Sequence, residues 1–294
     1  MLPIVLAFIA ALCFGVSKVL IRKAANVDSF VSTLYTLVIA APILCGFAVI
    51  NGDAFATYHY EPWTIMNLAL SGLIWLALGR VFAYASINLI GAARASQLTS
   101  TQVIFAAILS VVFLQENMTP VLGVGITAIF LGEILISFSY PQSEGKGAIS
   151  SERFRKGVAV GFMGGFLWGS AQLFAKEGVR GLGSSIMASF ITYLFAILAQ
   201  SVFVISFARR KVKLERTHVK FLLASGTVST IAVLVQYMAL RSAPVVAVNP
   251  IVNTSPLITL LASYIFMRKA EWINKKVLFG AVAVVFGAVL VAMY

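Results

Sequence analysis

Long apolar runs alternate with short polar stretches along the whole chain of 294 residues. A run of about 20 apolar residues can cross the roughly 30 Å hydrocarbon core of a bilayer as a helix. Backbone groups in lipid must be hydrogen-bonded internally, and no strand-like alternation of polar and apolar residues occurs, so we expect helices rather than barrel strands. The pattern predicts an all-α integral membrane protein with ten transmembrane helices, at about 3–21, 30–50, 66–89, 95–114, 119–138, 157–175, 185–208, 219–240, 246–267 and 277–293.

A weak internal repeat divides these runs into two sets of five. The segment 82–102 lies over 235–255 at a constant offset, and GITAIFLG at 125–132 lies over GAVAVVFG at 280–287. Similarity at a period near half the chain indicates a duplicated unit, and duplicated units are typical of membrane transporters. We therefore expect a first repeat at 1–140, a cytoplasmic linker at 141–156 and a second repeat at 157–294.

Composition and charge agree with a bilayer protein. Hydrophobic residues make up 60% of the chain and charged residues 11%, and the mean hydropathy is +0.97. The net charge of +12 comes from short clusters between the apolar runs rather than from one basic face, so we expect no nucleic-acid partner. Seventeen Lys and Arg residues lie in the odd-numbered connections and three in the even-numbered ones. This bias predicts cytoplasmic odd connections and both termini outside. Because each half has an odd number of spans, the repeats should be inverted.

Several short motifs recur at matching places in the two halves. FGVSK at 14–18 corresponds to WGSAQ at 168–172, and a short loop carrying Glu116 or Glu271 precedes a helix with glycines seven apart. With the length and the paired halves, these residues resemble the EamA-type members of the drug/metabolite transporter superfamily. The resemblance implies alternating access to a central cavity, lined mainly by the first, third and fourth helices of each half. It also implies small-metabolite substrates, such as amino acids, choline-like amines or nucleotide sugars. Comparable members often place both termini in the cytoplasm, whereas the charge bias here predicts the opposite.

Three ionisable residues fall inside the expected spans, where a charge is costly and marks a functional candidate. They are Lys18, Arg80 and Glu133. Their depths allow an ion pair between Glu133 and either cation, which would be a structural strut. In the functional alternatives, Arg80 anchors a substrate carboxylate or phosphate and Glu133 exchanges protons. Lys18 is also close enough to the membrane surface to reach it with its ammonium group.

Aromatic and amide side chains supply the remaining candidates. Tyr84 shares a helical face with Arg80 and has Tyr237 as its counterpart in the second half, so both rings could contact a substrate or pack against neighbouring helices. Trp168 lies far from either interface and is a candidate for the cavity wall. Asn249 and Asn253 lie four residues apart beside two prolines, where amides and freed carbonyls could bind a polar substrate or join helices together.

These residues favour a secondary active transporter that exports small metabolites, most simply amino acids. Arg80 would hold the carboxylate. The rings of Tyr84, Tyr237 and Trp168 would enclose the side chain, and Asn249 and Asn253 would bind the amine. A second hypothesis is efflux of amines or drugs, coupled to protons at Glu133 or at its pair with Lys18. A hypothesis of another class, a non-transporting membrane scaffold or receptor, would require a soluble module or long tails, and we expect neither from this sequence.

No pattern of enzyme chemistry is present. The two histidines, His59 and His218, have no Cys or carboxylate at ligand spacing, and no phosphate loop or nucleophile motif occurs. We expect no cofactor, no bound metal and no catalytic residue. The expected partners are the lipid bilayer and a small-molecule metabolite, an amino acid or an amine. The expected location is the cytoplasmic (inner) membrane, as a monomer or homodimer.

Overall fold

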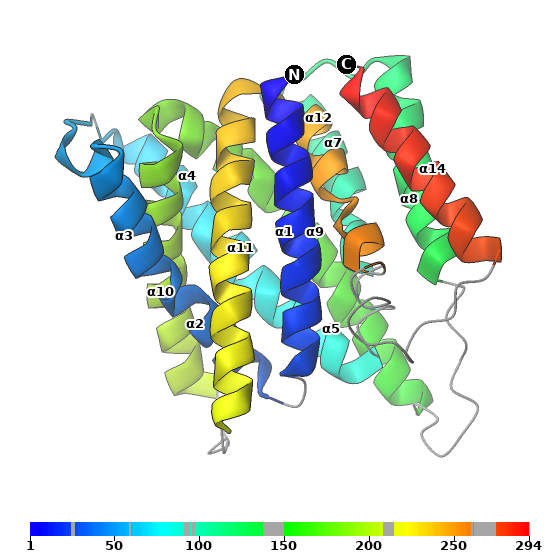
Figure 1. Ribbon diagram of the computed structural model, residues 1–294, viewed down its shortest axis with the longest axis horizontal. Coiled ribbons are helices and arrows are strands. Elements are labelled where there is room, and N and C mark those ends of the chain that lie inside the picture. The colour runs from blue at the N-terminus through cyan, green and yellow to red at the C-terminus, as the bar shows by residue number, and fades with distance from the viewer. Residues whose placement is uncertain are drawn as a thin grey trace.

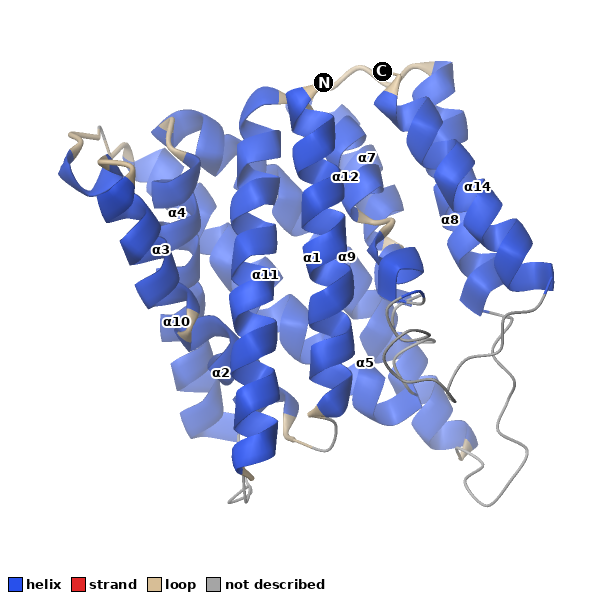
Figure 2. Ribbon diagram, viewed as in Figure 1, coloured by secondary structure: helices blue, strands red, loops and turns tan. Residues whose placement is uncertain are grey.

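The computed structural model describes residues 1–24, 27–58, 60–90, 95, 98–137, 150–207, 215–259, 261 and 275–293. His59, Glu271 and most of the expected linker lie outside these residues. The described part is a bundle of helices joined by short turns, and it contains no strand (Figures 1 and 2). In the first half the helices are α1 (Leu2–Lys23), α2 (Ser29–Val38), α3 (Ala40–Ile50), α4 (Pro62–Ser71), α5 (Arg80–Ile90), α7 (Gln102–Leu114) and α8 (Pro120–Ser137). In the second half they are α9 (Ser151–Leu182), α10 (Ser185–Phe207), α11 (Arg216–Ser242), α12 (Val245–Val252) and α14 (Lys275–Ala292).

Apolar helix occurs in the described part of each expected span. Among the described residues, six stretches are long and apolar enough to cross a membrane: 2–21, 29–50, 62–90, 151–182, 185–206 and 216–242. Four shorter apolar helices, at 98–114, 120–135, 245–259 and 278–292, fall on the other four expected spans. The prediction of an all-helical membrane protein is therefore confirmed for the described residues.

Local sequence signals account for several helix boundaries. Asp28 caps α2, since its Oδ1 accepts hydrogen bonds from the backbone N–H groups of Phe30 at 2.8 Å and Val31 at 3.3 Å. Ser150 caps α9 in the same way, and α9 ends at Gly183 with a left-handed φ of 76°, which glycine adopts without strain. A three-residue 3-10 turn, η1 (Asp53–Phe55), joins the second expected span to the third.

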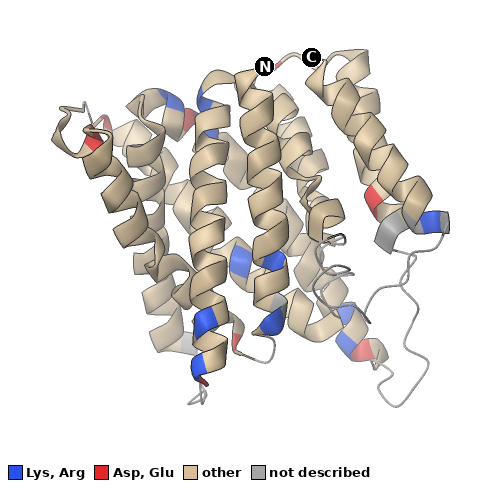
Figure 3. Ribbon diagram, in the orientation of Figure 1, with Lys and Arg blue, Asp and Glu red and all other residues tan. Residues whose placement is uncertain are grey.

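The outer surface of the bundle is apolar, as a bilayer requires. Leu12 in α1, Phe113 in α7 and Val202 in α10 are 53%, 68% and 60% exposed. Large apolar surface of this kind would be unfavourable in water but is solvated by lipid chains. Lys and Arg instead gather at the end of the bundle opposite the two termini, and a smaller group lies at the end near the termini (Figure 3).

Helices of the two halves pack on one another reciprocally. α1 packs on α11 and α12, while α9, which corresponds to α1 in the repeat, packs on α5 and α7. The last helices of the halves, α8 and α14, run antiparallel with their glycines in register. A methyl group on Gly125 would lie 2.9 Å from the carbonyl oxygen of Gly287, and one on Gly132 would lie 2.6 Å from that of Gly280. Glycine at these positions allows the two backbones to touch.

Candidate functional site

A cavity of about 70 Å³ lies inside the bundle, bounded by α1, α5, α9, α11 and α12. It has room for roughly five water-sized groups at about 10–15 Å³ each, which corresponds to a small metabolite. Its lining consists of aromatic and aliphatic side chains, two cations and several neutral polar groups: Phe14, Ser17, Lys18, Ile21, Trp75, Arg80, Tyr84, Ile87, Gln102, Trp168, Gln172, Ser229, Gln236, Asn249, Val252 and Ser255.

Two smaller cavities, of about 40 and 10 Å³, adjoin the central one. Both share Tyr84 and Ile87 with it, and the smaller one is also lined by Ala24 and Val27 at the C-terminal end of α1. The space therefore continues from the centre of the bundle toward the end opposite the termini. A wider depression of about 320 Å³ lies at the end near the termini, lined by loop and helix-end residues around Glu116 and Arg241. We assign the site to the central cavity because that is where the buried cations are.

An aromatic wall covers one side of the central cavity. Trp75 belongs to a π-helical segment, η2 (Gly72–Gly79), which separates α4 from α5; π-helical turns are rare and often occur at functional sites. The indole N–H of Trp168 donates to the carbonyl oxygen of Trp75 at 3.2 Å, and the ring of Phe14 lies 6.5 Å from that of Trp75. A methyl group on Gly79 would overlap the indole of Trp168, so glycine is required here.

Arg80 is a buried cation with neutral hydrogen-bonding partners. It is 5% exposed and is the first residue of α5. Its Nη1 donates to Thr36 Oγ1 at 3.4 Å, and its Nη2 donates to Tyr193 Oη at 3.2 Å. Within the described part of the chain it has no carboxylate partner. A guanidinium remains charged and has five N–H donors, and a buried charge is stable only when it is paired. Arg80 can therefore bind an anion that enters the cavity.

Lys18, rather than Arg80, is the cation that interacts electrostatically with Glu133. Its Nζ donates to Ser255 Oγ at 3.0 Å. Glu133 is 1% exposed; it accepts a hydrogen bond from Asn253 Nδ2 at 3.3 Å and also bonds to Ser100. Of the two pairings that the sequence allowed, this electrostatic interaction favours the one with Lys18. Glu133 does not line the central cavity, whereas Lys18 does.

Three buried amides form a second polar group in the lining. Gln236 Nε2 donates to Gln172 Oε1 at 3.0 Å, and Gln172 Nε2 donates to the carbonyl oxygen of Trp168 at 3.4 Å. Asn249 lies in α12, beside the bend that Pro250 introduces. All three side chains are 1% exposed. Two of their atoms, Gln236 Oε1 and Asn249 Nδ2, have no hydrogen-bonding partner among the described residues.

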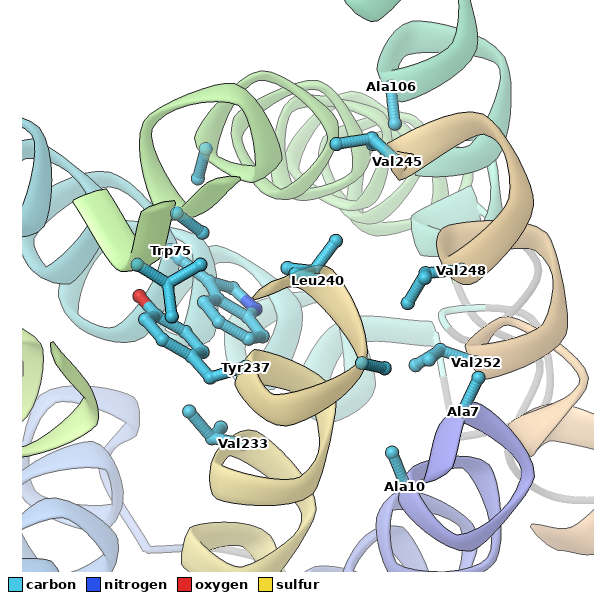
Figure 4. Close-up of a cluster of buried hydrophobic side chains, with 14 of the residues drawn as sticks. Ala7, Ala10, Trp75, Ala106, Val233, Tyr237, Leu240, Val245, Val248 and Val252 are labelled. Carbon is cyan, nitrogen blue, oxygen red and sulfur yellow. The ribbon is translucent and has the colours of Figure 1, made fainter. Parts of the chain in front are cut away.

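Two of the expected site residues, Tyr237 and Asn253, pack behind the cavity lining and are not part of it. Tyr237 is fully buried; its ring lies parallel to that of Trp75 (Figure 4), and its hydroxyl bonds to Ser71 and Thr192. Asn253 accepts a hydrogen bond from Gln102 at 2.7 Å and donates to the carbonyl oxygen of Ser100. Each therefore supports a residue that does line the cavity, Trp75 or Gln102. Of the two alternatives for Tyr237, contact with a substrate or packing against neighbouring helices, the structure shows the packing.

The structure thus brings together Lys18, Arg80, Tyr84, Trp168 and Asn249 in the lining of one cavity. Sequence reasoning missed Trp75 and Gln236. Trp75 could have been found by the criterion applied to Trp168, an indole far from either membrane surface. Gln236 gave a weaker signal, because an amide within a span commonly serves only to join helices.

The end of the bundle near the termini is closed by contacts around the α11–α12 turn, and one set of these contacts joins the two halves. Glu116, in the loop after α7, accepts hydrogen bonds from the N–H groups of Val245 at 2.8 Å and Val246 at 2.9 Å, at the start of α12. Lys176 of α9 donates to the carbonyl oxygens of Leu240 and Ala243, on either side of the α11–α12 turn. The valines of α12 pack against both neighbouring helices, with Val252 beside Ala7 of α1 and Val245 beside Ala106 of α7 (Figure 4).

A helical bundle with an apolar outer surface and a polar, solute-sized cavity at its centre is the architecture of a multi-pass membrane transporter. The chain belongs to the EamA-like transporter family, whose sequence profile matches residues 1–138 and again residues 155–293. Members of this family are transporters rather than enzymes. The expected family is therefore confirmed, and with it the general function of a membrane transporter.

The fold also resembles solved structures. One of them, described only as the crystal structure of a protein, superposes with a TM-score of 0.79 over 99% of this chain and 98% of its own, at 14% sequence identity. A likeness at this identity shows the fold alone. A search of curated protein sequences found no significant match.

Proposed function

We propose that this protein is a secondary active transporter that exports small metabolites, most simply amino acids, by alternating access to the central cavity. The observation that carries the substrate class is Arg80, a buried guanidinium that lines the cavity and has only neutral partners in the described part of the chain. A substrate carboxylate would supply the missing counter-charge, in a bidentate geometry that a guanidinium favours.

The charges of the lining favour an anionic group over a purely cationic substrate. Lys18 and Arg80 both line the cavity, and no Asp or Glu occurs among the described lining residues. A cationic amine or drug would meet two like charges without a carboxylate to bind it. Efflux of amines is therefore the weaker hypothesis, although proton coupling at Glu133 is compatible with amino-acid export.

The inverted-repeat architecture is part of this proposal. We place ten spans in the membrane, five from 1–140 and five from 157–294, joined by a linker at 141–156. The reciprocal packing of α1 and α9 on each other's partner helices supports this arrangement, as does the antiparallel contact of α8 with α14 through equivalent glycines. The end rich in Lys and Arg would face the cytoplasm, with both termini outside the cytoplasmic membrane.

Flux measurements in proteoliposomes test the proposed function. We expect Arg80→Gln to lower the apparent affinity for an amino-acid substrate by roughly ten- to a hundredfold, because hydrogen bonds to a charged group contribute about 1.5–3 kcal/mol. Arg155→Gln, at an exposed arginine near the N-terminal end of α9, is the matched control and should leave the flux unchanged. Unchanged amino-acid transport by Arg80→Gln would refute the proposal.

A further inference from the structure

The hydrogen-bonding partners of Gln172 and Gln236 determine which amide atom of each side chain donates and which accepts. The backbone carbonyl of Trp168 can only accept a hydrogen bond, so Gln172 must present its NH₂ group to it. The oxygen of Gln172 is then left to accept from the NH₂ group of Gln236. The orientation of each amide is thus fixed by the chain of bonds rather than by an arbitrary choice of nitrogen and oxygen.

This series of hydrogen bonds ends at the cavity with an acceptor atom. Gln236 Oε1 is buried, lines the cavity and has no donor among the described residues. A buried acceptor without a donor is unfavourable, and such atoms usually have an unrecorded partner or a functional role. Because the cavity also contains Arg80 and Lys18, it provides cations for an anion and one neutral acceptor for an N–H donor.

We propose that Gln236 recognises the amino group of the substrate, so that the cavity selects α-amino acids over carboxylates that lack the amine. This inference rests on the proposed function and refines it. The expectation from sequence placed the amine at Asn249 and Asn253. Asn253, however, uses its amide for Gln102, Ser100 and Glu133. Asn249 presents an unpartnered Nδ2 donor, which suits a substrate oxygen.

The arrangement divides recognition between two sets of residues. Arg80 and Asn249 act on the oxygens of the substrate and affect every carboxylate alike. Gln236 acts only on a substrate that has an amino group. A hydrogen bond between a neutral acceptor and an ammonium group contributes roughly ten- to a hundredfold in affinity, and this sets the size of the expected selectivity.

Calorimetric titrations of the purified protein in lipid nanodiscs test the proposal with two matched pairs of ligands. L-alanine is compared with propionate, and L-leucine with 4-methylpentanoate, because each pair differs by the amino group alone. For the unmodified protein we expect the amino acid of at least one pair to bind tenfold or more tightly than its partner. In Gln236→Met, which keeps the side-chain length, the two dissociation constants of that pair should become equal, while that of the carboxylate changes less than twofold.

Gln200→Met is the matched control, since Gln200 is fully buried in α10 and does not line the cavity. This variant should keep the original selectivity. Gln236→Glu should have the opposite effect. A charged acceptor should increase the selectivity for the amino acid, and it should weaken the binding of propionate and 4-methylpentanoate.

The outcomes separate this proposal from the proposed function. If Arg80→Gln weakens both ligands of a pair but Gln236→Met retains the selectivity for the amino acid, the role of Gln236 is refuted and amino-acid transport stands. If neither an amino acid nor its carboxylate analogue binds the unmodified protein, both proposals fail.

Discussion

The ring of Trp75 lies parallel to the ring of Tyr237, with 6.1 Å between the centroids and 2° between the planes. Trp75 belongs to the first half of the chain and lines the cavity, whereas Tyr237 belongs to the second half and lies behind it. The hydroxyl of Tyr237 is held by Ser71 at 3.1 Å and Thr192 at 3.0 Å. The position of one cavity-lining ring thus depends on a buried tyrosine that does not itself face the cavity.

Tyr237→Phe should therefore affect stability more than binding. It keeps the stacked ring but removes the hydroxyl, which should lower the free energy of unfolding by about 1–2 kcal/mol. Thermal unfolding in detergent measures this change, and amino-acid binding should stay within twofold. Tyr60→Phe, at a tyrosine that is half exposed, is the control and should change neither quantity. A large loss of affinity in Tyr237→Phe at unaltered stability would place Tyr237 in the binding site after all.

Gly79→Ala should disrupt the aromatic wall. The added methyl group would overlap the indole of Trp168, a rigid side chain that is bonded to Trp75 and cannot easily move aside. Overpacking of this kind typically costs about 1–3 kcal/mol, and here it should also lower substrate affinity at least tenfold. Gly46→Ala is the control, because a methyl group on that helical glycine in α3 meets no atom within 4 Å. Equal effects of the two substitutions would contradict the assignment of the wall.

Glu116→Ala should favour opening of the end near the termini. Both carboxylate oxygens accept hydrogen bonds from the first N–H groups of α12, and loss of such a cap costs about 0.5–2 kcal/mol. The equilibrium between closed and open forms should shift by about two- to thirtyfold, at tenfold for every 1.4 kcal/mol. A cysteine at Ser229, which lines the cavity, reports the shift as faster labelling by an impermeant thiol reagent applied outside.

The labelling experiment requires a background in which Cys13 and Cys45 are replaced by Ala. Glu177→Gln, at an acidic residue of the same end with no such cap, should leave the labelling rate unaltered. A labelling rate in Glu116→Ala that equals this control would show that the cap does not hold the end closed.

Glu133→Gln tests whether the buried carboxylate couples transport to protons. Glu133 is connected to the cavity through Asn253 and Gln102, and it interacts electrostatically with Lys18. If the carboxylate exchanges a proton in each cycle, the variant should lose accumulation driven by a proton gradient but retain the exchange of labelled for unlabelled substrate. Glu152→Gln, which removes an exposed ion pair with Lys156, is the control. Unaltered proton-driven accumulation in Glu133→Gln would exclude this role.

The orientation in the membrane can be tested at the two ends of α9. Arg155 and Arg180 are both exposed and lie near opposite ends of this helix. In the cysteine-free background, Arg180→Cys should react with an impermeant reagent on intact cells, whereas Arg155→Cys should react only after permeabilisation. The reverse pattern would place the termini in the cytoplasm.

The sequence predicted the helices well because lipid imposes a simple rule on length and polarity. The described part of each expected span contains apolar helix, and the face of α5 that carries Arg80 and Tyr84 does line the central cavity. The charged residues within the spans were also informative, because the cost of burying Arg80 or Lys18 implied a polar surrounding.

The direction in which individual side chains point could not be predicted in the same way. The depth of Glu133 in the membrane was compatible with Lys18 or Arg80, and the structure was needed to show an electrostatic interaction with Lys18. Tyr237 matches Tyr84 in the repeat, yet its ring packs on Trp75, which lies in the π-helical segment η2. The free oxygen of Gln236 could be identified only from the hydrogen bonds that join Gln236 to Gln172 and Gln172 to Trp168.

The glycine contact between α8 and α14 bears on how the two halves can move. Gly125 and Gly132 contact Gly287 and Gly280 backbone to backbone, so few side chains lie between the two helices. Sliding of one helix along the other would need such side chains to repack. Each half contributes one helix, so the pair fastens the halves together along one side of the bundle. If the halves rotate relative to each other, we expect the pivot at α8 and α14 and the largest displacements on the opposite side of the bundle, around α3 and α10 (Figure 1).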